Sequence, residues 1–253
     1  MSPTLEARDI TKVYGHVSAL SGANFDVDAG EVVALIGDNG AGKSTLVKIL
    51  SGTETPTSGE ILIDGRPVTI PGPLAARHYG IETVYQDLAL APHLNPVQNM
   101  YLGREIMRPG ILGRLGFMDK AQMRAGSKKA FDDLGATVRN FSGTVGAMSG
   151  GQKQAVAVAR AAAWGKRVIL LDEPTAALGV VQTKGVLDLI RKIRDRGLAV
   201  VFISHSMPAV MEVADRVEVM RLGRRVATYK ATDTSMEELV GAMTGAVTQE
   251  KKS

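Results

Sequence analysis

The sequence predicts an α/β fold with a mostly parallel sheet, an antiparallel β subdomain and an inserted α-helical subdomain. Three observations lead to this prediction. Apolar runs of strand length alternate with helical stretches in the second half of the chain, which is typical of a parallel sheet. Short segments of alternating polarity, separated by turn residues, occupy the first part. A glycine-rich turn near residue 40 joins an apolar strand to a helix.

The antiparallel subdomain is predicted from the first 65 residues. Polar and apolar side chains alternate there, and turn residues such as Asp64 and Gly65 end the segments. This alternation is typical of strands with one buried face. The expected strands are 5–10, 23–27 and 60–63.

The glycine-rich turn is the most informative motif. A β-branched apolar run at 31–36 precedes it, and helical spacing follows at 45–50. The N–H groups of such a turn and the positive end of the helix dipole converge on an anion. Lys43 would reach the β- and γ-phosphates of a nucleotide, and the Ser44 hydroxyl would bind Mg2+. The motif predicts a phosphate loop (P-loop) made of Gly37, Asp38, Asn39, Gly40, Ala41, Gly42, Lys43, Ser44 and Thr45.

The pattern becomes helical between about 71 and 146. Residues 100–106 and 121–134 have helical character, with glycine and proline between them, and we interpret about 87–150 as a helical subdomain inserted into the core. The later elements return to an alternation of helix and strand. We expect helices at 152–164 and 181–196 and strands at 168–171, 198–203 and 217–220.

Two carboxylates follow the apolar strand at 168–171. Ligands gather at the carboxyl ends of parallel strands, so Asp172 and Glu173 are expected beside the nucleotide. Asp172 would hold Mg2+ through water, and Glu173 would polarise the attacking water. By themselves, two acids at a strand end would be ordinary loop residues, and it is their combination with a phosphate loop that favours the catalytic interpretation.

A second anion site is expected where Ser149, Gly150, Gly151 and Gln152 open a helix. Free N–H groups at the helix start attract an anion. Taken in isolation, these residues are better explained as an N-cap serine followed by turn glycines.

Together these motifs resemble the ATP-binding subunit of ABC transporters, over roughly residues 5–240. The resemblance implies that Tyr14 stacks on adenine. It further implies that Gln86 contacts Mg2+ and senses a membrane partner, that Glu173 is the catalytic carboxylate and that His205 binds the γ-phosphate. The segment from Ser149 to Gln152 matches the signature that closes on the ATP of the opposite subunit.

The resemblance also implies the domain organisation and the partners. Residues 1–245 are expected to form a single nucleotide-binding domain, followed by a flexible tail at 246–253. Two copies would enclose two ATP molecules, with Mg2+, beneath transmembrane permease subunits. An extracytoplasmic sugar-binding protein would be an indirect partner of the chain. The segment 88–95 is a minor candidate for lining the groove that receives a short permease helix, in which Leu90 and Leu94 are the residues to test.

The segment 173–180 is similar to that of monosaccharide importers of the ribose, xylose and fructose type. Gly179 stands where many family members carry an aspartate. An importer of such a sugar is therefore the first functional hypothesis. The alternatives are an ABC ATPase of another transporter, such as a branched-chain amino acid importer or an exporter, and a soluble ABC ATPase without a transport role.

Composition limits the remaining classes. The 253 residues include no cysteine, which excludes disulfides and thiolate chemistry. The net charge is only +4 and aromatic residues make up 4%, so nucleic acid is not an expected partner. The start of the chain does not read as a signal peptide, and no apolar run approaches the roughly 18 residues that span a bilayer. We therefore expect a peripheral protein at the cytoplasmic face of the membrane.

Overall fold

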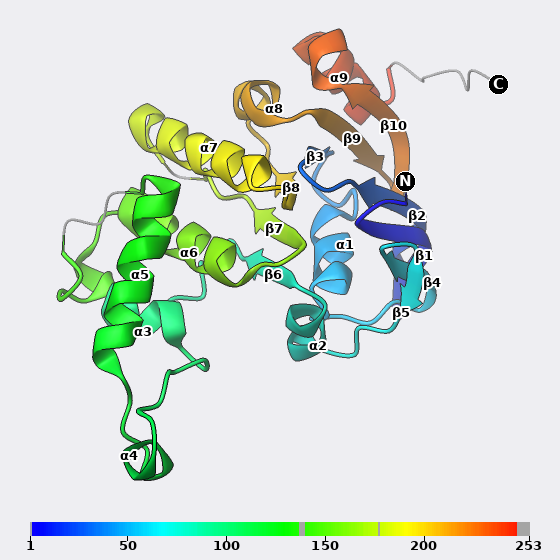
Figure 1. Cartoon of the computed structure of the whole chain (residues 1–253). Coiled ribbons are helices and arrows are strands. Elements are labelled where there is room, and N and C mark those ends of the chain that lie inside the picture. The colour runs from blue at the N-terminus through cyan, green and yellow to red at the C-terminus, as the bar shows by residue number, and fades with distance from the viewer. Residues whose placement is uncertain (1, 137–139, 177, 247–253) are drawn as a thin grey trace.

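The computed structural model of the protein describes residues 2–136, 140–176 and 178–246. It contains two sheets with helices on both sides of the larger one (Figure 1). The predicted α/β fold is confirmed. Most of the tail predicted at 246–253 lies outside the described residues.

The larger sheet has six strands in the order β10-β9-β3-β8-β7-β6. All neighbouring pairs are parallel except β9 and β10. Its strands are β3 (Val32–Ile36), β6 (Ile81–Val84), β7 (Val168–Asp172), β8 (Ala199–Ile203), β9 (Arg216–Arg221) and β10 (Arg224–Lys230).

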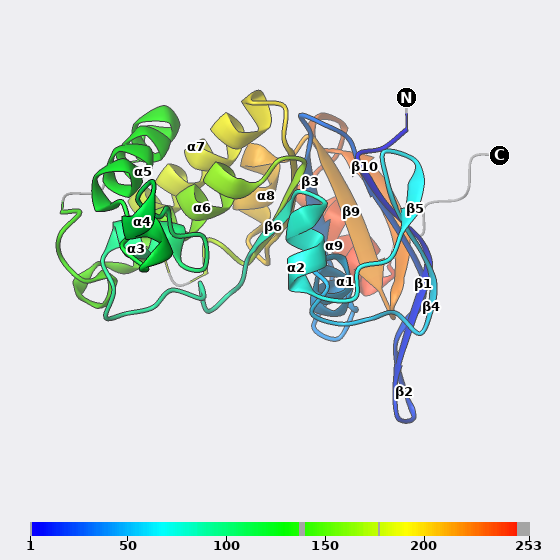
Figure 2. The ribbon, with the colours of Figure 1, turned by 60° about the horizontal axis from the view of Figure 1, so that its bottom comes forward.

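The smaller sheet has four antiparallel strands in the order β2-β1-β4-β5. These strands are β1 (Leu5–Tyr14), β2 (Val17–Val27), β4 (Ser58–Ile63) and β5 (Arg66–Val68). Figure 2 shows this sheet at one side of the molecule, with α3, α4 and α5 at the opposite side.

The helices begin at residues that suit a helix start. Asn95, Ser149 and Ser235 each form a capping box with the third helical residue, which satisfies otherwise unpaired N–H groups. The α-helices are α1 (Lys43–Leu50), α2 (Pro73–His78), α3 (Pro96–Tyr101), α4 (Ile111–Arg114), α5 (Lys120–Leu134), α6 (Gly150–Trp164), α7 (Val180–Asp195), α8 (Met207–Val213) and α9 (Met236–Thr244). The described residues also form two 3-10 helices, η1 (Val145–Ala147) and η2 (Ala231–Asp233).

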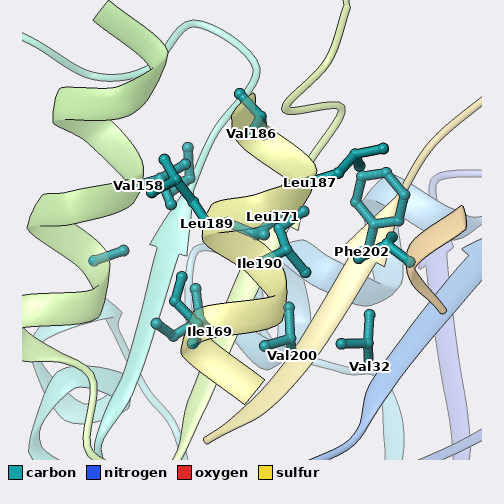
Figure 3. Close-up of a cluster of buried hydrophobic side chains, with 14 of the residues drawn as sticks. Val32, Val158, Ile169, Leu171, Val186, Leu187, Leu189, Ile190, Val200 and Phe202 are labelled. Carbon is teal, nitrogen blue, oxygen red and sulfur yellow. The ribbon is translucent and has the colours of Figure 1, made fainter. Parts of the chain in front are cut away.

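The large sheet separates two hydrophobic cores. Strand β3 contributes Val33 and Leu35 to the core that contains α1, and Val32 and Ala34 to the core on the other face. This division follows from the two-residue period of a strand. Figure 3 shows the second core, where α7 packs over β7 and β8. A strand with both faces covered reads as a continuous apolar run, as Val32–Ile36 does.

A partly buried polar network around the buried Glu218 joins the two sheets. Arg216 donates to Glu31 at 2.7 Å and to Glu218 at 2.6 Å. Arg225 donates to Asp26 of β2 at 2.8 Å and to Glu218 at 2.8 Å. Burial, with a smaller contribution from the neighbouring Asp26, raises the pKa of Glu218 to about 7, against the opposing effects of Arg225 and Arg216.

Two details of the helical region differ from the sequence prediction. The helix expected at 100–106 is α3, which begins at Pro96 and ends at Tyr101. The capping box of Asn95 starts it early, and Gly103, with φ +74°, follows its end. In addition, the stretch expected to become helical from about residue 71 contains β6, a strand of the large sheet paired with β7.

Candidate functional site

The predicted site residues meet because of the register of the parallel strands. Ala34 of β3 lies beside Phe202, Phe202 beside Leu171, and Leu171 beside Val84. Each of these four strands therefore ends at the same edge of the sheet. The residues that follow this row by two or three positions are Gly37, Gln86, Glu173 and His205.

The phosphate loop contains two positions where only glycine fits. Gly37 has φ +153°, and a Cβ there would collide with the carbonyl oxygen of Met220. Gly42 has φ +99°, and its Cβ would lie 2.7 Å from Leu20 of β2. Positive φ and close backbone approach are both tolerated by glycine alone. These contacts place the loop against β9 and β2.

The start of α1 is open for an anion. Its N-cap, Gly42, has no side-chain cap, and the first bond along the helix runs from Leu46 N to Gly42 O at 2.9 Å. The N–H groups of residues 42–45 therefore have no acceptor within the helix. Asp38, Asn39, Gly40 and Ser44 are exposed at the same end, whereas Ala41 is buried and Thr45 half-buried.

Lys43 lies under the loop with its side chain almost fully buried. Its Nζ donates to the carbonyl oxygens of Gly37 at 2.7 Å and of Asp38 at 3.0 Å. Burial lowers the pKa of this ammonium group, against the opposing effect of Glu173. No carboxylate of the described chain forms an ion pair with it, so a bound phosphate would supply its counter-charge.

The carboxylates and the histidine form one group. Oε1 of Glu173 lies 3.1 Å from Nε2 of His205, and the Glu173 N–H donates to Ile203 O at 3.1 Å. Glu173 has φ +50°, a conformation that costs about 1–3 kcal/mol outside glycine and is found mainly at functional sites. Burial, and then the neighbouring Glu173, raise the pKa of Asp172.

The same edge suits Mg2+ only together with phosphate oxygens. Asp172 and the exposed Ser44 hydroxyl offer the oxygen ligands that Mg2+ prefers. Within the described parts of the chain, no group of three or more His, Cys, Asp or Glu residues could hold a metal. This donor set fits an ion that keeps several waters and is shared with a nucleotide.

Gln86 and Tyr14 are placed at the borders of the site. Gln86 is exposed and lies two residues after the end of β6. Tyr14 is the last residue of β1, is 42% exposed, and has Lys12 Nζ 5.0 Å from its ring centre. Its pairing with Val17 puts it at the tip of the hairpin whose later residue Leu20 touches Gly42.

The signature segment lies apart from the phosphate loop of its own chain. Ser149 and Gln152 form the capping box of α6, with bonds of 3.4 and 3.1 Å. A cavity of about 270 Å³ beside this helix start is lined by Ser149, Gly151, Gln152 and residues of α7. Between residues 37–45 and 149–152 we find no hydrogen bond in the described regions. Among the described residues, the contact of Gly150 and its neighbours with a phosphate loop would therefore have to come from another copy of the chain or from a bound nucleotide.

One residue of the site was missed by sequence reasoning. Arg160 of α6 donates to Leu88 O at 3.0 Å and to Ala89 O at 2.8 Å. Leu88 and Ala89 have φ values of +62° and +44°. Arg160 therefore connects the helix that carries the signature to a strained turn two residues after Gln86. No local spacing in the sequence signals a contact over 71 residues.

The groove residues proposed at 88–95 divide into two kinds. Leu88 and Leu90 pack partly against the hydrophobic core, so a charge at Leu90 would also disturb packing. Leu94 is half-buried and stands outside that core. It is the better position for testing a partner contact.

Comparison of the sequence with known proteins finds a matching family model and relatives that cover nearly the whole chain. A family model described as ABC transporter matches residues 20–176. The fructose import ATP-binding protein FrcA of Rhizobium meliloti is 51% identical over 246 residues, covering 96% of this chain and 95% of the relative. The xylose/arabinose import ATP-binding protein XylG of Sulfolobus acidocaldarius is 45% identical over 244 residues, covering 96% and 95%.

A solved structure extends the likeness to three dimensions. It is described as the dimeric structure of a post-hydrolysis state of an ATP-binding cassette bound to ADP and Pi. It has a TM-score of 0.75 and 26% identity, and the match covers 90% of this chain and 98% of that one.

Proposed function

Because the chain belongs to the ABC transporter family of ATP-binding proteins, we propose that it hydrolyses ATP to drive the import of a monosaccharide. The observation that carries the proposal is the grouping of Lys43, Glu173 and His205 at one edge of the parallel sheet. Lys43 begins α1 after the loop that follows β3, whereas Glu173 follows β7 and His205 follows β8. Together they supply a cation, a base and a polar contact around one open helix start.

We propose the following roles for the chain's own groups. Lys43 and the N–H groups of the loop hold the β- and γ-phosphates. Glu173 orients a water molecule and accepts its proton as the water attacks the γ-phosphorus, while the bond from this phosphorus to the β–γ bridging oxygen breaks and ADP leaves. His205, 3.1 Å from Glu173, contacts the transferred phosphate and fixes the carboxylate. Tyr14 at the hairpin tip stacks on the adenine ring.

Mg2+ belongs to this proposal together with the nucleotide. The ion would neutralise charge that develops on the β- and γ-phosphate oxygens. Ser44 and Asp172 would hold it directly and through water, and Gln86 would contact it from the neighbouring strand end. Burial and the neighbouring Glu173 raise the pKa of Asp172 and so disfavour its charged form. A nearby cation would favour the charged form and lower this pKa.

We further propose that two copies act as a pair. The signature residues Ser149, Gly150, Gly151 and Gln152 form the start of α6, where Ser149 and Gly150 are exposed and the first turn of the helix holds no acidic residue. In a head-to-tail pair, each would close on the γ-phosphate bound to the partner's loop. Hydrolysis removes that contact, so the pair opens. The ATP-binding cassette described as dimeric with ADP and Pi bound supports pairing by similarity.

The membrane partners follow from the relatives. None of the described helices is both long enough and apolar enough to cross a membrane. We propose that permease subunits provide the pathway, that the chain lies at the cytoplasmic face of the membrane, and that an extracytoplasmic sugar-binding protein delivers the substrate. The names of the fructose and xylose/arabinose relatives favour a monosaccharide over an amino acid.

A Glu173→Gln variant tests the chemistry and the pairing together. Since the carboxylate is lost but the phosphate loop is intact, we expect ATP turnover to fall at least 100-fold while ATP still binds. With ATP and Mg2+ this variant should form dimers, measured by sedimentation velocity, alone or beside its permease. Glu212→Gln, at an exposed ion pair with Arg191, is the matched control. Full turnover in Glu173→Gln, or a strictly monomeric ATP-loaded variant, would contradict the proposal.

The sugar is tested in the assembled transporter. The ATPase of the complex in vesicles is measured with each monosaccharide and its binding protein. Stimulation by a pentose or hexose supports the proposal. Stimulation by a branched-chain amino acid instead would favour the alternative importer.

A further inference from the structure

A short hairpin protrudes from the end of the helical subdomain. We call residues 107–118 the 107–118 hairpin. Met107 and Met118 pair as an isolated bridge, and Arg108 N donates to Phe117 O at 2.9 Å. Helix α4 forms its tip and extends beyond α3 and α5 (Figure 1).

The hairpin exposes an unusual amount of apolar surface. Ile111 is 75% exposed, Leu115 67% and Phe117 55%. Six large apolar side chains are exposed within these twelve residues, and none of them belongs to either hydrophobic core. The full set is Met107, Ile111, Leu112, Leu115, Phe117 and Met118. Exposed apolar side chains gathered in so short a segment mark an interaction surface.

The charges of the hairpin have one sign. Arg108 and Arg114 are its only charged residues, both are exposed, and neither forms an ion pair with another described residue. The acidic residues that flank the hairpin already accept hydrogen bonds from backbone N–H groups. Asp119 caps α5 through Gln122 N at 2.9 Å, and Glu105 accepts from Gly103 N at 3.0 Å. The patch therefore combines apolar side chains with free guanidinium groups.

We propose that the 107–118 hairpin docks on an anionic lipid surface. Leu115, Phe117 and Ile111 enter the boundary between head groups and acyl chains, while Arg108 and Arg114 bind lipid phosphates. Apolar side chains beside cationic ones are the composition of segments that lie in a membrane interface. Pairing with the same hairpin of a second copy is disfavoured, because that hairpin carries the same positive charge. The proposal goes beyond ATP-driven transport and does not depend on it.

Flotation with vesicles tests the proposal on the full-length protein. We expect binding to vesicles of phosphatidylcholine with phosphatidylserine, weakened by added salt, and little binding to phosphatidylcholine alone. Leu115→Glu and Phe117→Glu should each weaken binding at least tenfold. Arg108→Gln and Arg114→Gln should each weaken it about fivefold, the factor for one basic residue at such a surface.

Leu74→Glu is the matched control, because Leu74 is 78% exposed on α2, outside the hairpin. It should leave vesicle binding unchanged. ATP turnover of all the variants in lipid-free solution should equal that of the parent protein, which shows that each one is folded. This readout also separates a failed lipid proposal from a failed ATPase proposal.

Three outcomes would overturn the inference. One is equal binding to neutral and anionic vesicles, or no binding to either. Another is a loss of self-association in the hairpin variants, which would assign the patch to a second copy. The third is a loss of assembly with purified permease in detergent while vesicle binding is unchanged, which would assign it to a protein partner.

Discussion

Replacing Arg160 with methionine tests whether one long-range contact holds the turn after Gln86. Arg160 donates to Leu88 O at 3.0 Å and to Ala89 O at 2.8 Å. Hydrogen bonds from charged groups are worth about 1.5–3 kcal/mol. The Leu88 carbonyl is partly buried, so losing its bond should cost about 2 kcal/mol. Ala89 is exposed, so water replaces much of the second bond, and its loss should cost about 0.5–1 kcal/mol.

The expected decrease in the free energy of unfolding is therefore about 2.5–3 kcal/mol, measured by urea denaturation. For a chain of this size it corresponds to a fall in Tm of about 5–10 °C. Methionine keeps most of the volume and leaves no buried charge, so the lost bonds dominate the change. Leu88 and Ala89, both at positive φ, would then relax and displace Gln86.

Two further variants distinguish the loss of this contact from the general effect of replacing an arginine. Arg160→Lys should recover about half of the lost stability, because an ammonium group can reach one carbonyl. Arg77→Met is the control, since Arg77 is half exposed and lies 4.0 Å from Glu82. It should change stability by about 0.5 kcal/mol or less. A decrease below about 1 kcal/mol in Arg160→Met, or an equal decrease in Arg77→Met, would refute the reasoning.

Three other predictions concern single positions. Burial raises the pKa of Glu218 to about 7 from an ordinary 4.5. Between these pH values the Glu218 carboxyl is ionised in the unfolded chain but still protonated in the folded protein. Stability should fall by up to about 3 kcal/mol as pH rises through this window, and the slope should flatten in Glu218→Gln; an unchanged pH profile would contradict this. Gly37→Ala should prevent folding or nucleotide binding. Gly40→Ala, with open space around its Cβ, should lower the free energy of unfolding by only about 1 kcal/mol. Thermal melts compare the two variants, and equal effects would contradict the steric argument. Gly179→Asp should leave basal ATPase within a small factor, because Gly179 caps α7 at φ −72° and an added Cβ meets only the mobile end of Gln182; a collapse of activity would show a backbone role.

The local elements and the motif chemistry could be predicted from sequence because neighbouring residues encode them. The glycine pattern between an apolar run and a helix identified the loop from Gly37 to Thr45. The apolar run at 168–171 followed by acids located β7 and its carboxylates. Errors arose where a cap or a glycine overrode periodicity, as when Asn95 and Gly103 shifted the expected helix at 100–106 to α3.

The sequence by itself determined which chemical groups the chain offers: a phosphate loop, two acids after a strand, and a histidine after another. Only the tertiary structure decided which of them meet. The register of β3, β8, β7 and β6 brings Glu173 within 3.1 Å of His205, and α6 brings Arg160 to the turn after Gln86. The physical reason is that spacing along the chain governs hydrogen bonds between near neighbours, whereas strand pairing and core packing govern contacts between distant residues.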